Sequence, residues 1–140
     1  RKQRALEEER ARVADELAKA KRETEDQALR EEAKAKGPHD LEEAQELFDA
    51  ALQLHEAKDF KESVKHFKKI YFQFPKHQIG VTSAYNVACG YALAGDKERA
   101  LDWLETSVKG GFAKIDHLRS DPDLDSLRDE KRYKRLLADR

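Results

Sequence analysis

The chain has 140 residues, about the size of one domain. Charged residues make up 41% of it, and 28 basic residues nearly balance 29 acidic ones, so the formal net charge is -1. This balance provides no overall basic field, and we expect no nucleic-acid partner. No apolar run reaches the roughly 18 residues of a membrane-spanning helix, so direct membrane insertion is not expected either.

The sequence contains one cysteine, Cys89, which cannot form an internal disulfide, and it has no methionine. Because it begins at Arg1, we expect it to be the C-terminal part of a larger protein. No short apolar stretch behind a basic start indicates a signal peptide. Since a targeting signal could lie outside this piece, the compartment is left open: a soluble, cytoplasmic location is slightly favoured, and a membrane-anchored or exported parent protein is the alternative.

Residues 1–37 are predicted to form a long charged helix. The first 36 residues hold 11 basic and 10 acidic side chains, and most of the others are strong helix formers. Leu6, Val13 and Ala20 are seven positions apart and Leu17 follows Val13 by four, which is a weak coiled-coil pattern. That pattern is interrupted by Arg10, Thr24 and Gln27. Two interpretations stay open, a solvated spacer and a surface for weak helical pairing.

A compact, all-α region is predicted to follow Gly37-Pro38, which favours a helix end. Asp40 and Glu43 form a capping-box-like start, Asp59 can cap another helix, and Pro75 ends it. Apolar residues then recur at helical spacing in four stripes, which predicts four amphipathic helices of about 12–16 residues. The stripes are Ala44, Leu47, Phe48, Ala51 and Leu54; Phe60, Val64, Phe67, Tyr71 and Phe74; Val81, Ala84, Tyr85, Ala88 and Tyr91; Ala100, Leu101, Leu104 and Val108.

An internal repeat links these helices, because Asp59 and Asp96 lie 37 residues apart and each separates two stripes. The segment AYNVACGYALAGDKERALDWLETSV resembles a tetratricopeptide repeat, and DFKESVKHFKKIYFQFP resembles the second half of another. The resemblance places two repeats at 44–77 and 81–114, within 40–114. Phe112 stands where the closing proline of the family would be, so the array is expected to end there.

The segment 115–140 resembles the helical cap that closes many bacterial tetratricopeptide proteins, with DPDL, LR and an aromatic residue followed by LL. Asp121 and Pro122 suit a helix start. The resemblance implies antiparallel helix pairs in a right-handed superhelical stack that follows the charged helix and ends in this cap. We expect eight side chains to be buried: Leu47, Leu54, Phe67, Ala88, Tyr91, Ala100, Leu104 and Leu127.

In this family the first helix of each pair lines an inner groove that holds a partner peptide. Carried onto this chain, the groove consists of Gln45, Phe48, Asp49, Leu52, His55, Thr82, Tyr85, Asn86 and Cys89. Asn86 occupies the position that clamps a ligand backbone or terminal carboxylate in peptide-binding members. The basic and amide partners of that clamp are absent, because Phe48 and Leu52 stand in their positions.

The side chains that could act in catalysis or bind a metal do not combine into a known motif. His55, His66 and His77 are eleven positions apart, roughly 16 Å along a helix, which is too far for one ion. The aspartates at 121, 123 and 125 imitate a calcium loop, but Ser126 and Arg132 stand where glycine and glutamate are required. Cys89 has no local base. We expect no enzyme activity, no cofactor and no metal.

The sequence therefore predicts a non-catalytic protein–protein interaction module. Its partner would be another protein or peptide held in the inner groove. The alternative is a structural element that forms a homo-oligomer through the charged N-terminal helix.

Overall fold

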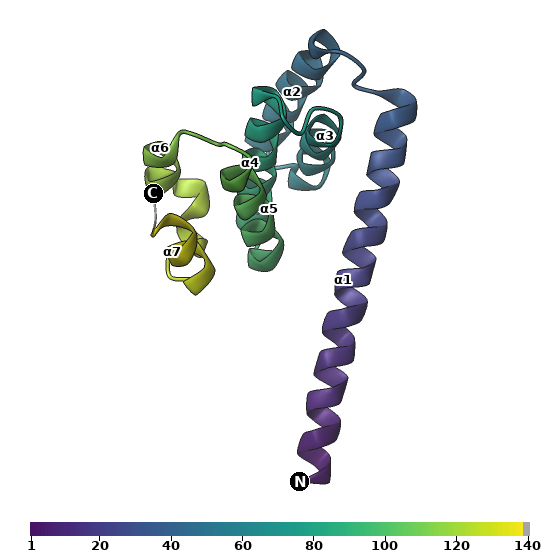
Figure 1. The fold of residues 1–140 in the computed structure, drawn as a ribbon, viewed down its shortest axis with the longest axis vertical. Coiled ribbons are helices and arrows are strands. Elements are labelled where there is room, and N and C mark those ends of the chain that lie inside the picture. Colours follow the sequence, from purple (N-terminus) through teal and green to yellow (C-terminus); the bar gives the residue numbers. More distant parts are fainter. Residues whose placement is uncertain (139–140) are drawn as a thin grey trace.

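The computed structural model describes residues 1–138 and confirms an all-α fold, without a strand in that range (Figure 1). No helix in the described range is both long enough and apolar enough to cross a membrane. The elements in chain order are α1 (Lys2–Lys36), α2 (Leu41–Glu56), α3 (Phe60–Gln73), α4 (Gln78–Leu93), α5 (Lys97–Lys109), α6 (Ile115–Ser120), the 3₁₀ helix η1 (Pro122–Leu127) and α7 (Lys131–Leu137).

Helices α2–α5 form two successive hairpins, α2–α3 and α4–α5, that pack on one another through α3 and α4. The two hairpin turns have the same construction 37 residues apart. Lys58 and Gly95 both adopt positive φ, 65° and 87°. The aspartate that follows each of them caps the next helix: Asp59 accepts from the amide of Glu62 and Asp96 from that of Arg99. The repeat in the sequence is thus a repeat in backbone conformation.

Small residues allow the helices of the core to approach closely. Ala51, Ala84, Ala88 and Ala100 are fully buried. Gly90 of α4 faces α3, and a Cβ added there would lie 2.7 Å from Cγ2 of Val64. Such an approach excludes any larger residue unless the neighbour moves.

Five of the eight predicted core residues are buried, namely Phe67, Ala88, Ala100, Leu104 and Leu127. The other three, Leu47, Leu54 and Tyr91, are only partly buried. Leu47 and Leu54 lie on α2, the first helix of the stack, which no earlier repeat covers. Tyr91 lines a cleft beside α1. Partial burial of these three is therefore a consequence of their place at the edges of the stack.

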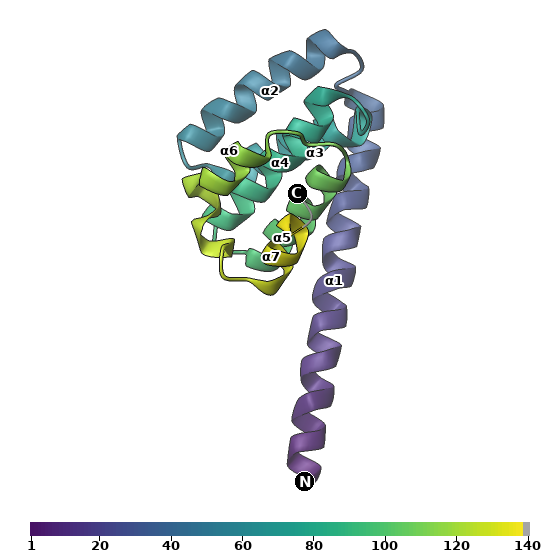
Figure 2. The ribbon, with the colours of Figure 1, turned by 60° about the vertical axis from the view of Figure 1, so that its left-hand side comes forward.

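The C-terminal cap and α1 lie on opposite sides of the two hairpins in Figure 1, and the cap lies in front of the hairpins in Figure 2. The cap comprises α6, η1 and α7, and it buries Leu118, Leu124 and Leu127 completely. Asp121 caps η1 by accepting a hydrogen bond from the amide of Asp123, with Pro122 at the first position of the helix. Because η1 packs on α4 and α7 on α5, the cap covers the last hairpin from two directions.

Helix α1 is 35 residues long, and its two halves differ in environment. Residues 1–21 are exposed at every position, and this half extends beyond the other helices (Figure 1). The second half packs along α3, where Ala33 is fully buried. This second half departs from the expected solvated spacer.

Candidate partner-binding surface

Helix α2 carries five of the nine predicted groove residues, and three of these are exposed. Gln45 and Asp49 are exposed and hydrogen-bond one another, Nε2 to Oδ1, at 3.0 Å. Leu52 follows on the same face with 38% of its surface exposed. Phe48 is half-buried because its ring packs edge-to-face on Phe67, with centroids 5.4 Å apart. This face of α2 therefore offers two apolar side chains beside a polar pair.

Helix α4 adds Thr82 and Asn86, which are one helical turn apart and half-buried. Within the described range, neither side chain forms a hydrogen bond to another residue. Since α2 and α4 also touch, these groups continue the face of α2. We call Gln45, Phe48, Asp49, Leu52, Thr82 and Asn86 the open wall.

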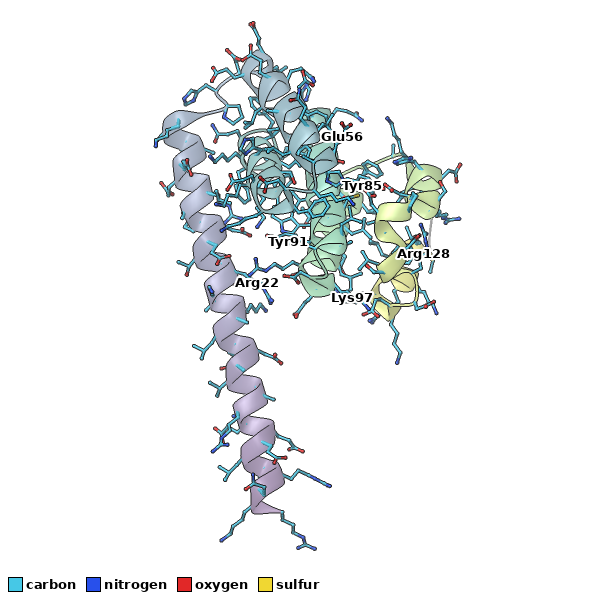
Figure 3. The ribbon with its side chains drawn as sticks, turned by 180° about the vertical axis from the view of Figure 1, so that it is seen from behind. Arg22, Glu56, Tyr85, Tyr91, Lys97 and Arg128 are labelled. Atoms are coloured by element: carbon cyan, nitrogen blue, oxygen red, sulfur yellow. The ribbon has the colours of Figure 1, made fainter. Side chains whose placement is uncertain are left out.

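Tyr85 and Cys89 were predicted to line the groove, but both are buried beneath the cap, with 3% and 2% of their surface exposed. The Tyr85 hydroxyl donates to Oδ2 of Asp121 at 2.5 Å, and its ring stacks on Phe112 at 4.3 Å. Figure 3 shows Tyr85 on the side of α4 that faces the cap. The prediction that these two residues contact a partner is thus corrected: they hold the cap on α4.

His55 lies where the open wall meets the cap. Its Nε2 atom is 3.0 Å from Oδ2 of Asp123, so the end of α2 is joined to η1. The His55 side chain is 19% exposed, so this predicted groove residue is engaged with the cap and is not free on the open wall.

Cys89, Asp121 and Asp123 are the residues whose donor atoms could come together on a metal ion, since these atoms lie within 4.8 Å of one another. The carboxylate of Asp121 already has partners, the hydroxyl of Tyr85 and the amide of Asp123. Burial raises the pKa of the Cys89 thiol, and the neighbouring aspartates raise it further. A protonated, enclosed thiol is a poor nucleophile. We therefore interpret these three residues as contacts between α4 and the cap.

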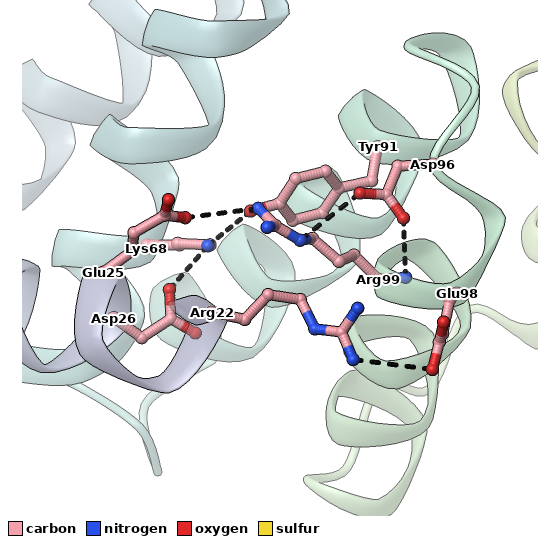
Figure 4. A network of polar contacts seen from close by, with 8 residues as sticks. All are labelled: Arg22, Glu25, Asp26, Lys68, Tyr91, Asp96, Glu98 and Arg99. Atoms are coloured by element: carbon pink, nitrogen blue, oxygen red, sulfur yellow. Dashed lines mark hydrogen bonds and ion pairs between the residues drawn. The ribbon is translucent and has the colours of Figure 1, made fainter. Parts of the chain in front are cut away.

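A second polar network, which sequence reasoning missed, joins α1 to the hairpins (Figure 4). Lys68 is 4% exposed; its ammonium pairs with Asp26 at 2.6 Å and also donates to the hydroxyl of Tyr91. Arg22 pairs with Glu98 and Arg99 with Glu25, both at 3.5 Å. The partners of these three ion pairs are 42 to 76 positions apart. Local spacing could not have matched them.

A cleft of about 700 Å³ lies between α1 and the hairpins beside this network. Its walls are largely apolar, from α1, α3 and α4, and Tyr91 lies on the side of α4 that faces it (Figure 3). The charged residues Lys61, Lys65 and Glu32 also line it. None of the open-wall residues lines this cleft.

The chain was compared with family models, solved structures and curated proteins. No family model matches the chain, and no solved structure matches it. A curated relative is a chloroplastic protein of Arabidopsis thaliana, which is 31% identical over 108 residues. The match covers 77% of this chain and 30% of that protein. The chain therefore spans less than a third of the length of this relative.

Proposed function

We propose that this chain is a non-catalytic interaction module of the tetratricopeptide-repeat type, which holds a peptide or helix of a partner protein on the open wall. The observation that carries the proposal is the pairing of two kinds of group on one face. Leu52 and Phe48 offer apolar surface, and the Thr82 and Asn86 side chains have unused hydrogen-bonding groups. An apolar anchor beside backbone-directed polar groups suits a short peptide.

The repeat type is supported by the two matching hairpins. Their turns share positive φ at Lys58 and Gly95, aspartate caps follow at the same offset, and alanines are buried where the helices cross. In a stack of such hairpins the first helices share one face. The open wall is made only from first helices, α2 and α4.

The occupant is expected to carry one or two apolar side chains and little net charge. Asp49 is the one ionised side chain of the open wall, so electrostatic attraction contributes little there. Two hairpins provide few contact positions, and we expect a dissociation constant in about the micromolar range, which corresponds to about -8 kcal/mol. A tightly bound terminal carboxylate is not expected, since the open wall has no basic side chain.

For the compartment, the relative's name places that protein in the chloroplast. We favour a chloroplast over the cytoplasm for the protein that carries this chain. A fluorescent fusion of that whole protein, expressed in plant cells, should overlap with chlorophyll emission. Emission spread through the cytoplasm would contradict this assignment.

The test of the open wall is a selection of peptides from a random displayed library on the 140-residue chain, followed by affinity measurements with variants. Leu52→Ala with Asn86→Ala should weaken a selected peptide about tenfold or more, since each loses a direct contact. The control, Gln53→Ala with Lys97→Ala, removes two exposed side chains that lie off the open wall and should leave affinity within about twofold. Equal losses in both double variants would refute the proposal.

A further inference from the structure

The first half of α1 has no partner in the described structure, although it carries apolar side chains. Leu6, Val13 and Leu17 are 51%, 42% and 66% exposed, and they account for three of the six exposed large hydrophobic residues in the described range. In proteins most of the stability of a helix comes from packing of its apolar face. An apolar stripe on a helix is the usual surface for another helix.

The stripe and the docked face lie on opposite sides of α1. At about 100° per residue, Leu6, Val13, Leu17 and Ala20 fall within an arc of about 60°. The residues that contact the hairpins in the second half, including Asp26 and Ala33, are centred about 180° away. A helix that packs on the stripe would therefore meet the side of α1 that faces away from the domain.

The charges beside the stripe select one orientation. With Leu6, Val13 and Ala20 at heptad position d and Leu17 at a, the flanking g positions are Lys2, Glu9, Glu16 and Glu23, and the flanking e positions are Glu7, Ala14 and Lys21. Parallel, in-register pairing brings each g position near the following e position of the other helix. Lys2 then faces Glu7 and Glu16 faces Lys21, which gives only attractive pairs. Antiparallel pairing brings Lys2 near Glu23 but sets Glu9 and Glu16 against each other.

We propose that residues 2–24 of α1 form a parallel, in-register, two-stranded coiled coil with the same segment of a second copy. Neither Glu16 nor Lys21 has an ion-pair partner among residues 1–138, so both are free for it. The other a positions of this segment are polar, namely Gln3, Arg10 and Thr24, and they lower the stability of the seam. The stem of Arg10 packs there while its charge extends into water. The dimer is therefore weak, and it leaves the two open walls unobstructed because the domains lie on the outer sides.

The first test is the mass of the 140-residue chain by sedimentation equilibrium between about 10 µM and about 1 mM. The weight-average mass should rise from 16.2 kDa towards twice that value. Leu6→Glu with Leu17→Glu should abolish the rise. Ala11→Glu with Ala18→Glu adds the same charge to exposed positions off the stripe and should keep it. A parent chain that stays at 16.2 kDa, or equal effects of both variants, would overturn the proposal.

The second test determines orientation by disulfide cross-linking of two single variants, Leu6→Cys and Ala20→Cys, oxidised as a mixture. The native Cys89 is buried and does not compete. In the parallel arrangement position 6 links to 6 and position 20 to 20, as mass spectrometry of the peptides would show. A predominance of links between 6 and 20 would demonstrate antiparallel pairing and contradict the proposal. The Ala11→Cys variant measures links that arise from random collision.

Discussion

The ammonium group of Lys68 lies 2.6 Å from the carboxylate of Asp26, and this ion pair joins α3 to α1. The Lys68 side chain is 5% exposed, so its charge is almost withdrawn from water. Its nitrogen also lies 5.4 Å from the ring centroid of Trp103. A buried ammonium requires a partner, so the Asp26 pair ties the second half of α1 to the domain, together with the more exposed pairs of Arg22 with Glu98 and of Arg99 with Glu25.

Loss of this partner should be measurable as a loss of stability. Asp26→Ala is expected to lower the free energy of unfolding by about 1–3 kcal/mol, between the values for exposed and fully buried pairs. Urea unfolding followed by circular dichroism gives this value. In the control, Glu31→Ala removes an exposed pair with Lys34 and should change stability by less than about 0.5 kcal/mol. Similar values for both would show that α1 is only loosely attached.

Exchanging the residue types at the two positive-φ positions, Lys58 and Gly95, tests whether the two hairpin turns are equivalent. Gly95 has φ 87°, and an added Cβ would meet nothing within 4 Å, so backbone conformation alone opposes a side chain there. Gly95→Lys should lower stability by about 1 kcal/mol, and Lys58→Gly should leave it unchanged or raise it by up to about 1 kcal/mol. Thermal unfolding of both variants measures the effect. A stabilising Gly95→Lys would mean that the second turn differs from the first.

The hydroxyl of Tyr85 is expected to hold the cap in place. Tyr85→Phe removes the short hydrogen bond to Oδ2 of the buried Asp121 carboxylate and should cost about 1–3 kcal/mol. Tyr71→Phe is the matched control, since no hydrogen bond of the Tyr71 hydroxyl is present in the described range, and its effect should stay below about 0.5 kcal/mol. Denaturant titration compares the two. If Tyr85→Phe is as mild as the control, this contact does not hold the cap.

Stability should decrease in mild acid because of His66. Burial, assisted by Lys69, lowers the pKa of His66. The folded state thus resists a proton that the unfolded chain accepts near its ordinary pKa of about 6.5. Stability is complete above that pH and is lost progressively as the pH falls below it towards the lowered value. His66→Gln should flatten the dependence of Tm on pH between about 7 and about 5, whereas His39→Gln, at an exposed position, should not.

The hairpins could be predicted from sequence because their information is local. The apolar stripes repeat at helical spacing, and Asp40, Asp59 and Asp121 each cap a helix as expected from their positions. The prediction of four helices of about 12–16 residues is confirmed, since α2 to α5 have 13 to 16 residues.

The candidate site was only partly predictable, because burial depends on distant partners. Tyr85 and Asn86 are neighbours in sequence, yet η1 covers the first and leaves the second half-exposed. The decisive contact is with Asp121, 36 positions away. Likewise, the pairing of Lys68 with Asp26 depends on where the Gly37-Pro38 connection directs α1. A charge pattern alone gives no information on that direction.

The most direct test of the open wall is chemical-shift mapping of the isotope-labelled 140-residue chain by NMR, with a library-selected peptide as the ligand. We expect the largest shifts of backbone amides at 45–52 and 82–86, and side-chain shifts at Asn86. Amides of α5, residues 97–109, should change little, because α5 contributes no residue to the open wall. Shifts confined to α1 or α7, with the open wall unchanged, would contradict the assignment of this surface to partner binding.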